Sequence, residues 1–238
     1  MPLLSLNTRT LVPELMDDPS LDPAEHRRAL KGLARINTLS GAGTSLWRNV
    51  RPLLARASSG TLLDVAAGSG DVTLAVAQAA RRDGVSLDLR VVEISPEAAS
   101  VIRSRASAAS VGMTVDVRDA VAEGLGLTDE SVDVAVCSLF LHHLTEDGVV
   151  SILREMKRVA RRGVVVSDLR RCRTGLAAAY VAGRVLTRSP VVRVDAVLSV
   201  RAAFTVAELT TLAEQAGLSG VRILASWPFR LTLTWSRA

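Results

Sequence analysis

The sequence contains little lysine and few aromatic residues. Lysine occurs only at Lys31 and Lys157 among 238 residues, so arginine supplies nearly all of the positive charge. Aromatic residues make up 3% of the chain, and aliphatic side chains must therefore fill most of the core. The net charge is +5, but no basic run is interleaved with aromatic residues, and we expect no nucleic-acid partner.

Cysteine is also scarce, and long hydrophobic runs are missing. Cys137 and Cys172 form no Cys-x-x-Cys pair, so we expect free thiols, as in a reducing compartment. The first residues lack the charged and apolar regions of a signal peptide. No apolar segment reaches the roughly 20 residues of a membrane-spanning helix. These absences predict a cytoplasmic protein without a membrane span.

The hydrophobic pattern divides the chain at about residue 60. Residues 1–59 are expected to form an N-terminal helical arm, with helices over 24–37 and 44–56 and an N-cap at Asp22. Residues 60–238 are expected to form the main domain. Within it, residues 170–204 are an expected lid insertion, of which the pattern assigns 190–204 to neither helix nor strand.

The main domain alternates apolar β-branched runs with amphipathic helical segments. This alternation is typical of an α/β protein with a doubly wound parallel sheet covered on both faces. Strands are expected at 61–67, 87–94, 114–120, 131–140 and 163–169, and helices at 71–82, 95–108, 146–160 and 205–218. Residues 221–227 and 230–237 are expected to form a hairpin, and the strict alternation of the last strand predicts an antiparallel edge position.

The segment LLDVAAGSGD, residues 62–71, places a glycine-rich turn between a buried strand and a helix. Small residues let a ligand approach the backbone, and the helix N-terminus offers free N–H groups. The Gly-Lys-Ser/Thr of a phosphate-binding P-loop is absent. A dinucleotide fingerprint needs a third glycine where this chain has Thr73. The segment therefore predicts a ligand site without choosing the ligand.

Acidic residues follow the next two strands. A carboxylate at Glu93 can accept hydrogen bonds from both hydroxyls of a ribose, in an NAD-type or an adenosyl-type ligand. Asp119 and Ala120 follow the third strand, where an acid and a small residue can accommodate adenine. Together these residues predict a nucleoside.

Two adjacent histidines, His142 and His143, follow the fourth strand. Histidine accepts protons near neutral pH, so one of the pair is a candidate general base. We expect no metal site, because adjacent side chains should point apart and no third ligand is spaced to join them. A serine hydrolase is disfavoured, because Gly-x-Ser-x-Gly is absent.

Taken together, residues 60–238 resemble the class I S-adenosylmethionine-dependent methyltransferases. The resemblance implies a Rossmann-like seven-stranded sheet with a reversed last strand, and S-adenosylmethionine as the cofactor. The nearest branch resembles the methyltransferases of ubiquinone and menaquinone biosynthesis. Two positions depart from that branch, because Ala66 replaces the first glycine of the motif and His142–His143 replace Arg-Asn. The pattern is more similar to enzymes of polyketide or aromatic biosynthesis.

The resemblance also implies roles for individual residues. His142 is the expected base in methyl transfer to a hydroxyl or activated carbon of a small molecule, with His143 beside the cofactor. Arg35, Asn37, Asp168 and Arg170 are candidate substrate contacts. The implied cofactor residues are Asp64, Ala66, Gly68, Ser69, Gly70, Asp71, Glu93, Ile94, Asp119, Ala120, Ser138 and Leu139.

Several alternatives stay open at this point. One is an NAD(P)-dependent oxidoreductase on the same architecture, and another is a methyltransferase-like protein that binds the cofactor without catalysing a reaction. The methyl acceptor, the choice between oxygen and carbon methylation, and a homodimeric assembly are likewise left open by the sequence.

Overall fold

A single seven-stranded sheet forms the centre of the computed structural model, which describes residues 6–18, 20–55 and 57–237. Four stretches lie outside the described residues: residues 1–5 and 19 of the expected arm, position 56 in its second expected helix, and residue 238. The strand order is β3-β2-β1-β4-β5-β7-β6. The strands are β1 (Ser59–Val65), β2 (Ser86–Glu93), β3 (Met113–Val117), β4 (Val132–Ser138), β5 (Ala160–Leu169), β6 (Arg222–Ser226) and β7 (Arg230–Ser236).

The first five strands are parallel, and β7 runs antiparallel to both of its neighbours. The predicted doubly wound fold and the reversed last strand are therefore confirmed. The predicted edge position of the last strand is wrong, because β7 lies between β5 and β6. The alternating pattern reports which face of a strand is buried and does not report whether both of its edges are paired.

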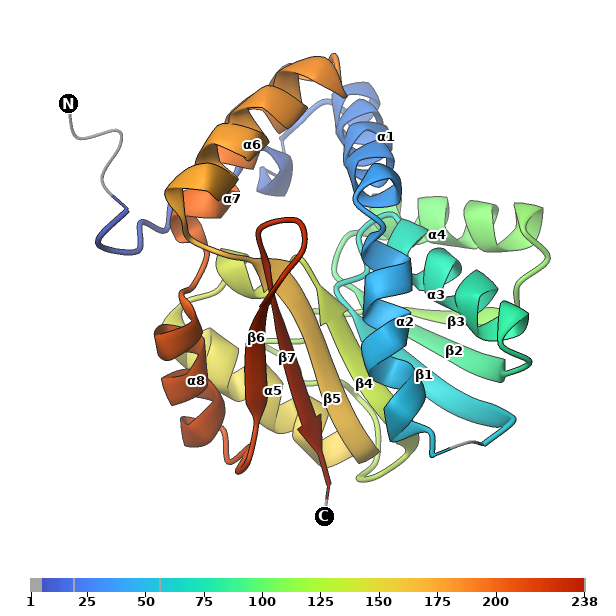
Figure 1. Ribbon diagram of the computed structural model, residues 1–238. Helices are drawn as coiled ribbons and strands as arrows, with labels where there is room; N and C mark the ends of the chain where they lie inside the picture. The colour runs from blue at the N-terminus through green and yellow to red at the C-terminus, as the bar shows by residue number, and fades with distance from the viewer. Residues whose placement is uncertain (1–5, 19, 56, 238) are drawn as a thin grey trace.

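Helices cover both faces of the sheet (Figure 1). One apolar cluster joins α2 (Ala42–Leu53) and α3 (Asp71–Arg82) to one face, and another joins α5 (Glu146–Val159) and α8 (Val206–Gln215) to the other. A capping box of Thr205 and Glu208 begins α8. Helix α4 (Pro96–Ala108) connects β2 and β3 and begins at the Ser95 cap.

Three further helices arch over the carboxyl ends of the parallel strands (Figure 1). They are α1 (Pro23–Leu39), α6 (Arg173–Val185) and α7 (Pro190–Ala202), with short 3₁₀ helices η2 (Leu15–Asp17) and η3 (Leu141–His143) beneath them. The unassigned residues 190–204 are thus mostly helical. Their apolar period is unclear because the polar residues Asp195 and Ser199 are among the buried positions of α7.

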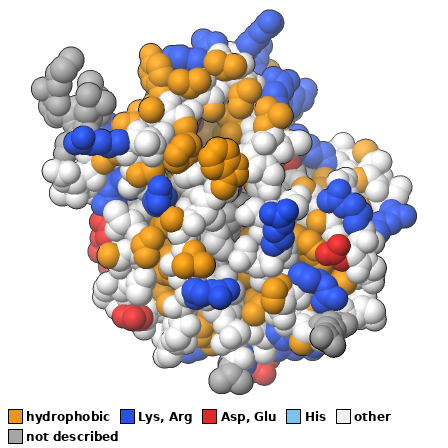
Figure 2. All heavy atoms as spheres, in the orientation of Figure 1, with side chains coloured by type: hydrophobic (Ala, Val, Ile, Leu, Met, Phe, Trp, Pro, Cys, Tyr) orange, Lys and Arg blue, Asp and Glu red, His pale blue; other side chains and the backbone are white. Residues whose placement is uncertain are grey.

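Hydrophobic side chains gather on the upper part of one face, around a hollow below the helical arch (Figure 2). Exposed apolar residues of the chain include Tyr180 and Val181 on α6 and Trp227 at the tip of the β6–β7 hairpin. Within the described part of the chain, no helix has the combined length and hydropathy that a membrane crossing requires.

Candidate functional site

The glycine-rich turn after β1 has an unusual backbone. Ala66, Gly68 and Gly70 all have positive φ values, of 57°, 56° and 69°. Glycine tolerates this left-handed conformation, whereas alanine adopts it at a cost of roughly 1–2 kcal/mol. Ala66 stands where the family that the sequence resembles has glycine. Its backbone nevertheless adopts the left-handed conformation that is typical of glycine. A Cβ on Gly68 would meet no atom within 4 Å, so the turn borders open space.

Glu93 connects this turn to the end of β2. Its carboxylate accepts a hydrogen bond from the N–H of Gly68 at 2.8 Å and another from the N–H of Ser95 at 3.0 Å. Burial raises the pKa of Glu93 above its ordinary value, although these backbone hydrogen bonds oppose the shift. Two predicted cofactor segments are therefore held together by one buried carboxylate.

Asp64 lies fully buried at the base of the same turn. Burial raises its pKa to about 7, with the charges of Asp71 and Glu93 adding to the effect and a hydrogen bond from Thr73 opposing it. Three buried polar atoms at predicted cofactor positions have no hydrogen-bond partner among the described residues: Asp64 Oδ1, Asp71 Oδ2 and Ser138 Oγ. Buried polar atoms normally have partners, so these three favour a polar ligand at this edge of the sheet.

We expect Asp64→Asn to make the protein more stable relative to wild type as the pH rises. The folded-state pKa of Asp64, about 7, lies above its ordinary value of 3.8. Its contribution to stability is therefore complete below pH 3.8 and is lost as the pH rises through 7. The difference in free energy of unfolding between variant and wild type should grow by about 2 kcal/mol between about pH 5 and pH 8.

Denaturant unfolding at both pH values measures this difference. Asp88→Asn, on exposed β2 surface, is the matched control and should show no such growth. A difference that is the same at both pH values would contradict the raised pKa of Asp64.

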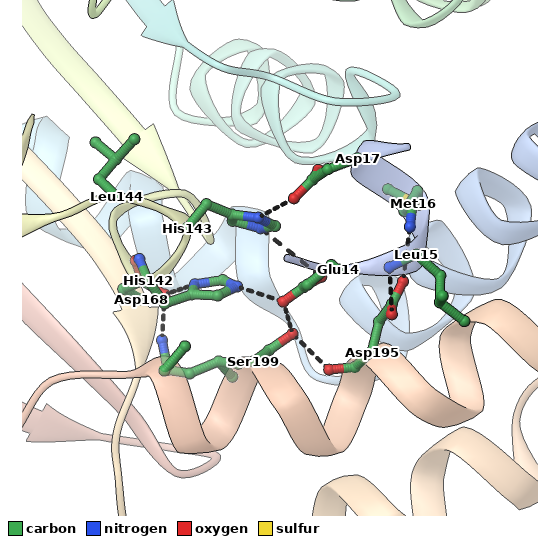
Figure 3. A network of polar contacts seen from close by, with 12 residues as sticks. Glu14, Leu15, Met16, Asp17, His142, His143, Leu144, Asp168, Asp195 and Ser199 are labelled. Atoms are coloured by element: carbon green, nitrogen blue, oxygen red, sulfur yellow. Dashed lines mark hydrogen bonds and ion pairs between the residues drawn. The ribbon is translucent and has the colours of Figure 1, made fainter. Parts of the chain in front are cut away.

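His142 and Asp168 form a buried pair at the ends of β4 and β5 (Figure 3). The Nδ1 atom of His142 lies 2.6 Å from Asp168 Oδ1, and the His142 backbone N–H donates to Asp168 Oδ2 at 3.2 Å. Burial would raise the pKa of Asp168, but the charge and hydrogen bond of His142, with the N–H of Leu169, hold it below its ordinary value. Because Asp168 is ionised, Nδ1 of His142 carries the hydrogen and Nε2 faces away.

His143 lies against the N-terminal arm (Figure 3). Its Nδ1 atom is 2.9 Å from Asp17 Oδ2, and its Nε2 atom is 3.9 Å from Glu14 Oε2. Burial lowers the pKa of His143, but Asp17 and Glu14 outweigh this effect and raise it to about 9. The two imidazole rings do not point apart as the sequence analysis expected, since their centroids are 4.3 Å apart and both Nε2 atoms face Glu14.

Two residues of the N-terminal arm, Arg9 and Glu14, contact the segment that carries the two histidines, and the sequence analysis did not identify either of them. Glu14 lies 3.7 Å from His142 Nε2, and Arg9 donates to the backbone oxygens of His142 and Leu144 at 3.0 and 2.6 Å. Arg9 also lies 4.0 Å above the ring of Phe204. No local pattern marks these residues, because their partners lie more than 125 positions away in the sequence.

The remaining predicted residues lie around the same end of the sheet. Asp119 accepts hydrogen bonds from the N–H groups of Val121 and Ala122 and so shapes the turn after β3. Ala120 is buried, Ile94 is exposed, and Leu139 has a positive φ of 57°. Ser69 donates to Asp71 and accepts from Arg105.

The candidate substrate residues are placed differently from one another. A hollow of about 470 Å³ between α1, α2 and α3 brings Arg35 and Asn37 to the same wall as Asp71. Arg35 also donates to the backbone oxygen of Leu186 and so connects α1 to α6. Asp168 is turned toward His142, and the backbone of Arg170 pairs with Phe229. The structure therefore groups Arg35 and Asn37 at one hollow with Asp71, whereas the Asp168 carboxylate binds His142.

Arg230, at the start of β7, is a buried cation that sequence analysis did not single out. Its side chain is 4% exposed and donates through Nη2 to Asn37 at 3.1 Å and to Ser40 at 3.3 Å. Its Nη1 atom has no partner among the described residues. Burial lowers the pKa of Arg230, although Asp168 and Asp71 oppose the shift.

We expect Arg230→Met to stabilise the protein without ligand by about 1–3 kcal/mol, because the desolvation cost of this buried cation, which forms no ion pair among the described residues, outweighs its hydrogen bonds to Asn37 and Ser40 and its longer-range attraction to acidic groups. Denaturant unfolding measures the gain, and the exposed Arg222→Met on β6 is the matched control. A loss of stability larger than that of the control would contradict this prediction and would show that the guanidinium supports the fold.

Residues 62–163 match the family model described as "Methyltransferase domain". The matched segment begins within β1 and ends within β5, so it contains the glycine-rich turn, Glu93, Asp119 and both histidines of η3. No curated protein matches the chain significantly in sequence.

Solved structures are similar to this chain in fold. A methyltransferase dependent on S-adenosylmethionine from Aquifex aeolicus is 16% identical, with a TM-score of 0.59 over 92% of this chain and 100% of that chain. The plantazolicin methyltransferase BpumL, in complex with SAH, is 13% identical, with a TM-score of 0.63 over 93% and 92%. The S-adenosylmethionine-dependent methyltransferase SibL, in its apo form, is 18% identical, with a TM-score of 0.66 over 98% of this chain and 64% of that chain. This chain therefore spans less than two thirds of SibL, and likeness at these identities concerns the fold alone.

Proposed function

Because the chain carries an S-adenosylmethionine-dependent methyltransferase domain at residues 62–163, we propose that it methylates a small molecule with His142 as general base. The acceptor is a hydroxyl or an activated carbon of a phenolic, polyketide or quinone-like compound. The observation that carries the proposal is the buried His142–Asp168 pair, which leaves His142 Nε2 facing the arm at the carboxyl ends of β4 and β5.

The residues around the glycine-rich turn fit the cofactor. Asp64, Gly68, Ser69 and Asp71 would hold its methionine part, Glu93 and Ile94 its ribose, and Asp119 and Ala120 its adenine, with Ala66, Gly70, Ser138 and Leu139 lining the site. The buried atoms without partners at Asp64, Asp71 and Ser138 support this assignment. The open space beside Gly68 supports it as well.

The bound cofactor supplies a methyl group that is already activated on a sulfonium, so the protein has to align the acceptor, exclude water and remove a proton. The acceptor O–H, or an acidic C–H, gives its proton to His142 Nε2. Asp168 holds the ring through Nδ1 and stabilises the imidazolium that forms. Asp168 is thus a positioning residue in this proposal and not the substrate contact that the sequence analysis named.

Two features favour this function over the alternatives. An NAD(P)-dependent oxidoreductase of this fold needs a glycine where Thr73 stands, and the Thr73 hydroxyl is used to bind Asp64. A non-catalytic binding protein would have no need for an oriented His–Asp pair at the acceptor side.

The test uses the full chain in two steps. Calorimetry with S-adenosylhomocysteine should show binding, and its absence at millimolar ligand would contradict the cofactor assignment. Methyl-labelled S-adenosylmethionine is then incubated with a panel of phenols, hydroquinones and β-dicarbonyl compounds. Label in a methylated product supports the proposed function, whereas binding without transfer to any panel member counts against it.

A further inference from the structure

Three metal-ligating side chains meet beneath the helical arch (Figure 3). They are His142 and His143 from η3 and Glu14 from the N-terminal arm. His142 Nε2 lies 3.7 Å from Glu14 Oε1, and His143 Nε2 lies 3.9 Å from Glu14 Oε2. One ligand atom from each residue lies within 4.8 Å of the other two. All three side chains are largely buried, at 4%, 22% and 10% exposure.

Each histidine is oriented by a carboxylate on its other ring nitrogen. Asp168 binds Nδ1 of His142 at 2.6 Å, and Asp17 binds Nδ1 of His143 at 2.9 Å. A carboxylate acceptor keeps the hydrogen on Nδ1, so the lone pair of a neutral ring lies on Nε2. Metal-binding histidines are typically held in this way, through a carboxylate that fixes the tautomer and the ring orientation.

The third ligand is also fixed in place. The Ser199 hydroxyl donates to Glu14 Oε1. The backbone N–H groups of Leu15 and Met16, which follow Glu14, donate to the Asp195 carboxylate at 2.9 and 3.1 Å. Glu14 is therefore anchored on α7, and its carboxylate faces the two imidazoles without a local rearrangement of the arm.

The charges of the cluster favour a cation. Four carboxylates, those of Glu14, Asp17, Asp168 and Asp195, belong to this network (Figure 3). The two imidazoles and the nearby Arg9 can supply three positive charges at most, and only if both rings are protonated. An ion that binds both Nε2 atoms displaces any hydrogen they carry, including that of His143, whose pKa is raised to about 9, and the negative excess is then larger.

We propose that Glu14, His142 and His143 bind one divalent transition-metal ion of the zinc class, with a fourth position open to an exogenous ligand. Two imidazoles and one carboxylate suit zinc, whereas magnesium and calcium prefer oxygen ligands. Zinc bonds of about 2.0–2.1 Å in tetrahedral geometry place ligand atoms roughly 3.3–3.4 Å apart. The three ligand atoms lie within 4.8 Å of one another, so closing on one ion requires them to approach by at most about 1.4 Å.

Metal binding would change how the site works, and this consequence rests on the proposed function. A bound ion takes the Nε2 lone pair of His142, so the same atom cannot accept a proton from the acceptor. The ion would also connect the arm to η3 above the acceptor side. Zinc should therefore inhibit methyl transfer when His142 is the base.

The test is a titration of the metal-free full chain with zinc, in competition with a chromophoric zinc chelator. We expect one equivalent to bind, and Glu14→Gln and His143→Ala each to weaken the affinity at least tenfold. Cobalt gives a second readout, since four-coordinate Co²⁺ has visible absorption bands that should be lost in both variants. The matched controls are His26→Ala and Cys172→Ser, which remove the third histidine and an accessible thiol and should bind zinc as wild type does.

Absence of zinc binding by wild type at micromolar metal would overturn the site. Binding that is unchanged in Glu14→Gln and in His143→Ala would also overturn it. Calorimetry with S-adenosylhomocysteine separates this outcome from failure of the proposed function. If S-adenosylhomocysteine binds and zinc does not, only the metal site is contradicted. If zinc binds and S-adenosylhomocysteine does not, only the proposed function is contradicted.

Discussion

Replacing His142 by alanine is expected to lower turnover by about 10²–10⁴-fold while leaving the affinity for S-adenosylhomocysteine nearly unchanged. His142 lies in η3, after the end of β4, and its ring is held by Asp168 on β5. The variant removes the proposed proton acceptor and leaves the proposed cofactor residues in place. Turnover is measured with the acceptor that the labelled-methyl panel identifies, and affinity is measured by calorimetry.

A conservative variant and a matched control sharpen this result. His142→Gln keeps a side chain of comparable length but cannot accept a proton at neutral pH, so it should be about as impaired as alanine. His26→Ala, on α1, removes a histidine outside η3 and should retain wild-type turnover. Equal turnover of His142→Ala and wild type would exclude His142 as the base.

Replacing Glu93 by alanine is expected to weaken S-adenosylhomocysteine binding by about 100-fold or more. The carboxylate that would bind the ribose is lost, and hydrogen bonds to charged groups are worth about 1.5–3 kcal/mol each. The glycine-rich turn also loses two hydrogen bonds, which the Glu93 carboxylate accepts from the N–H groups of Gly68 and Ser95. Calorimetry measures the affinity, and circular dichroism checks that the variant is folded.

Glu97→Ala is the matched control for Glu93→Ala. Glu97 lies four positions further on, in the first turn of α4, and its exposed carboxylate pairs with Arg27 on the surface. It should bind S-adenosylhomocysteine as wild type does. Wild-type affinity in folded Glu93→Ala would remove Glu93 from the cofactor site and, with it, the main support for a ribose at the end of β2.

Local sequence patterns were sufficient for most of the helices and strands, although not for α7, and for the residues at the strand ends. Apolar β-branched runs and helical periods depend on neighbours within a few positions, and capping residues such as Ser95 and Thr205 act within one turn. The same reasoning placed Gly68, Glu93, Asp119 and His142 at strand ends, because parallel strands end at one edge of a sheet.

Contacts between distant segments could not be predicted in this way. The pairing of His142 with Asp168, 26 residues later, depends on the register of β4 against β5. The approach of Glu14 to both histidines depends on how α7 packs over η3 and holds the arm through Asp195 and Ser199. The buried position of Arg230 depends on β7 inserting between β5 and β6, where the sequence indicated an edge.

The sequence by itself therefore determined the fold class, the glycine-rich turn and the chemical types of residue at the strand ends. All of these follow from short-range periodicity and backbone chemistry. Only the tertiary structure decided that Asp168 binds the ring of His142, that two adjacent histidines face one carboxylate, and that α7 is a helix with a polar buried stripe. These features arise from packing between segments far apart in the chain, and no pattern within one segment specifies its partner.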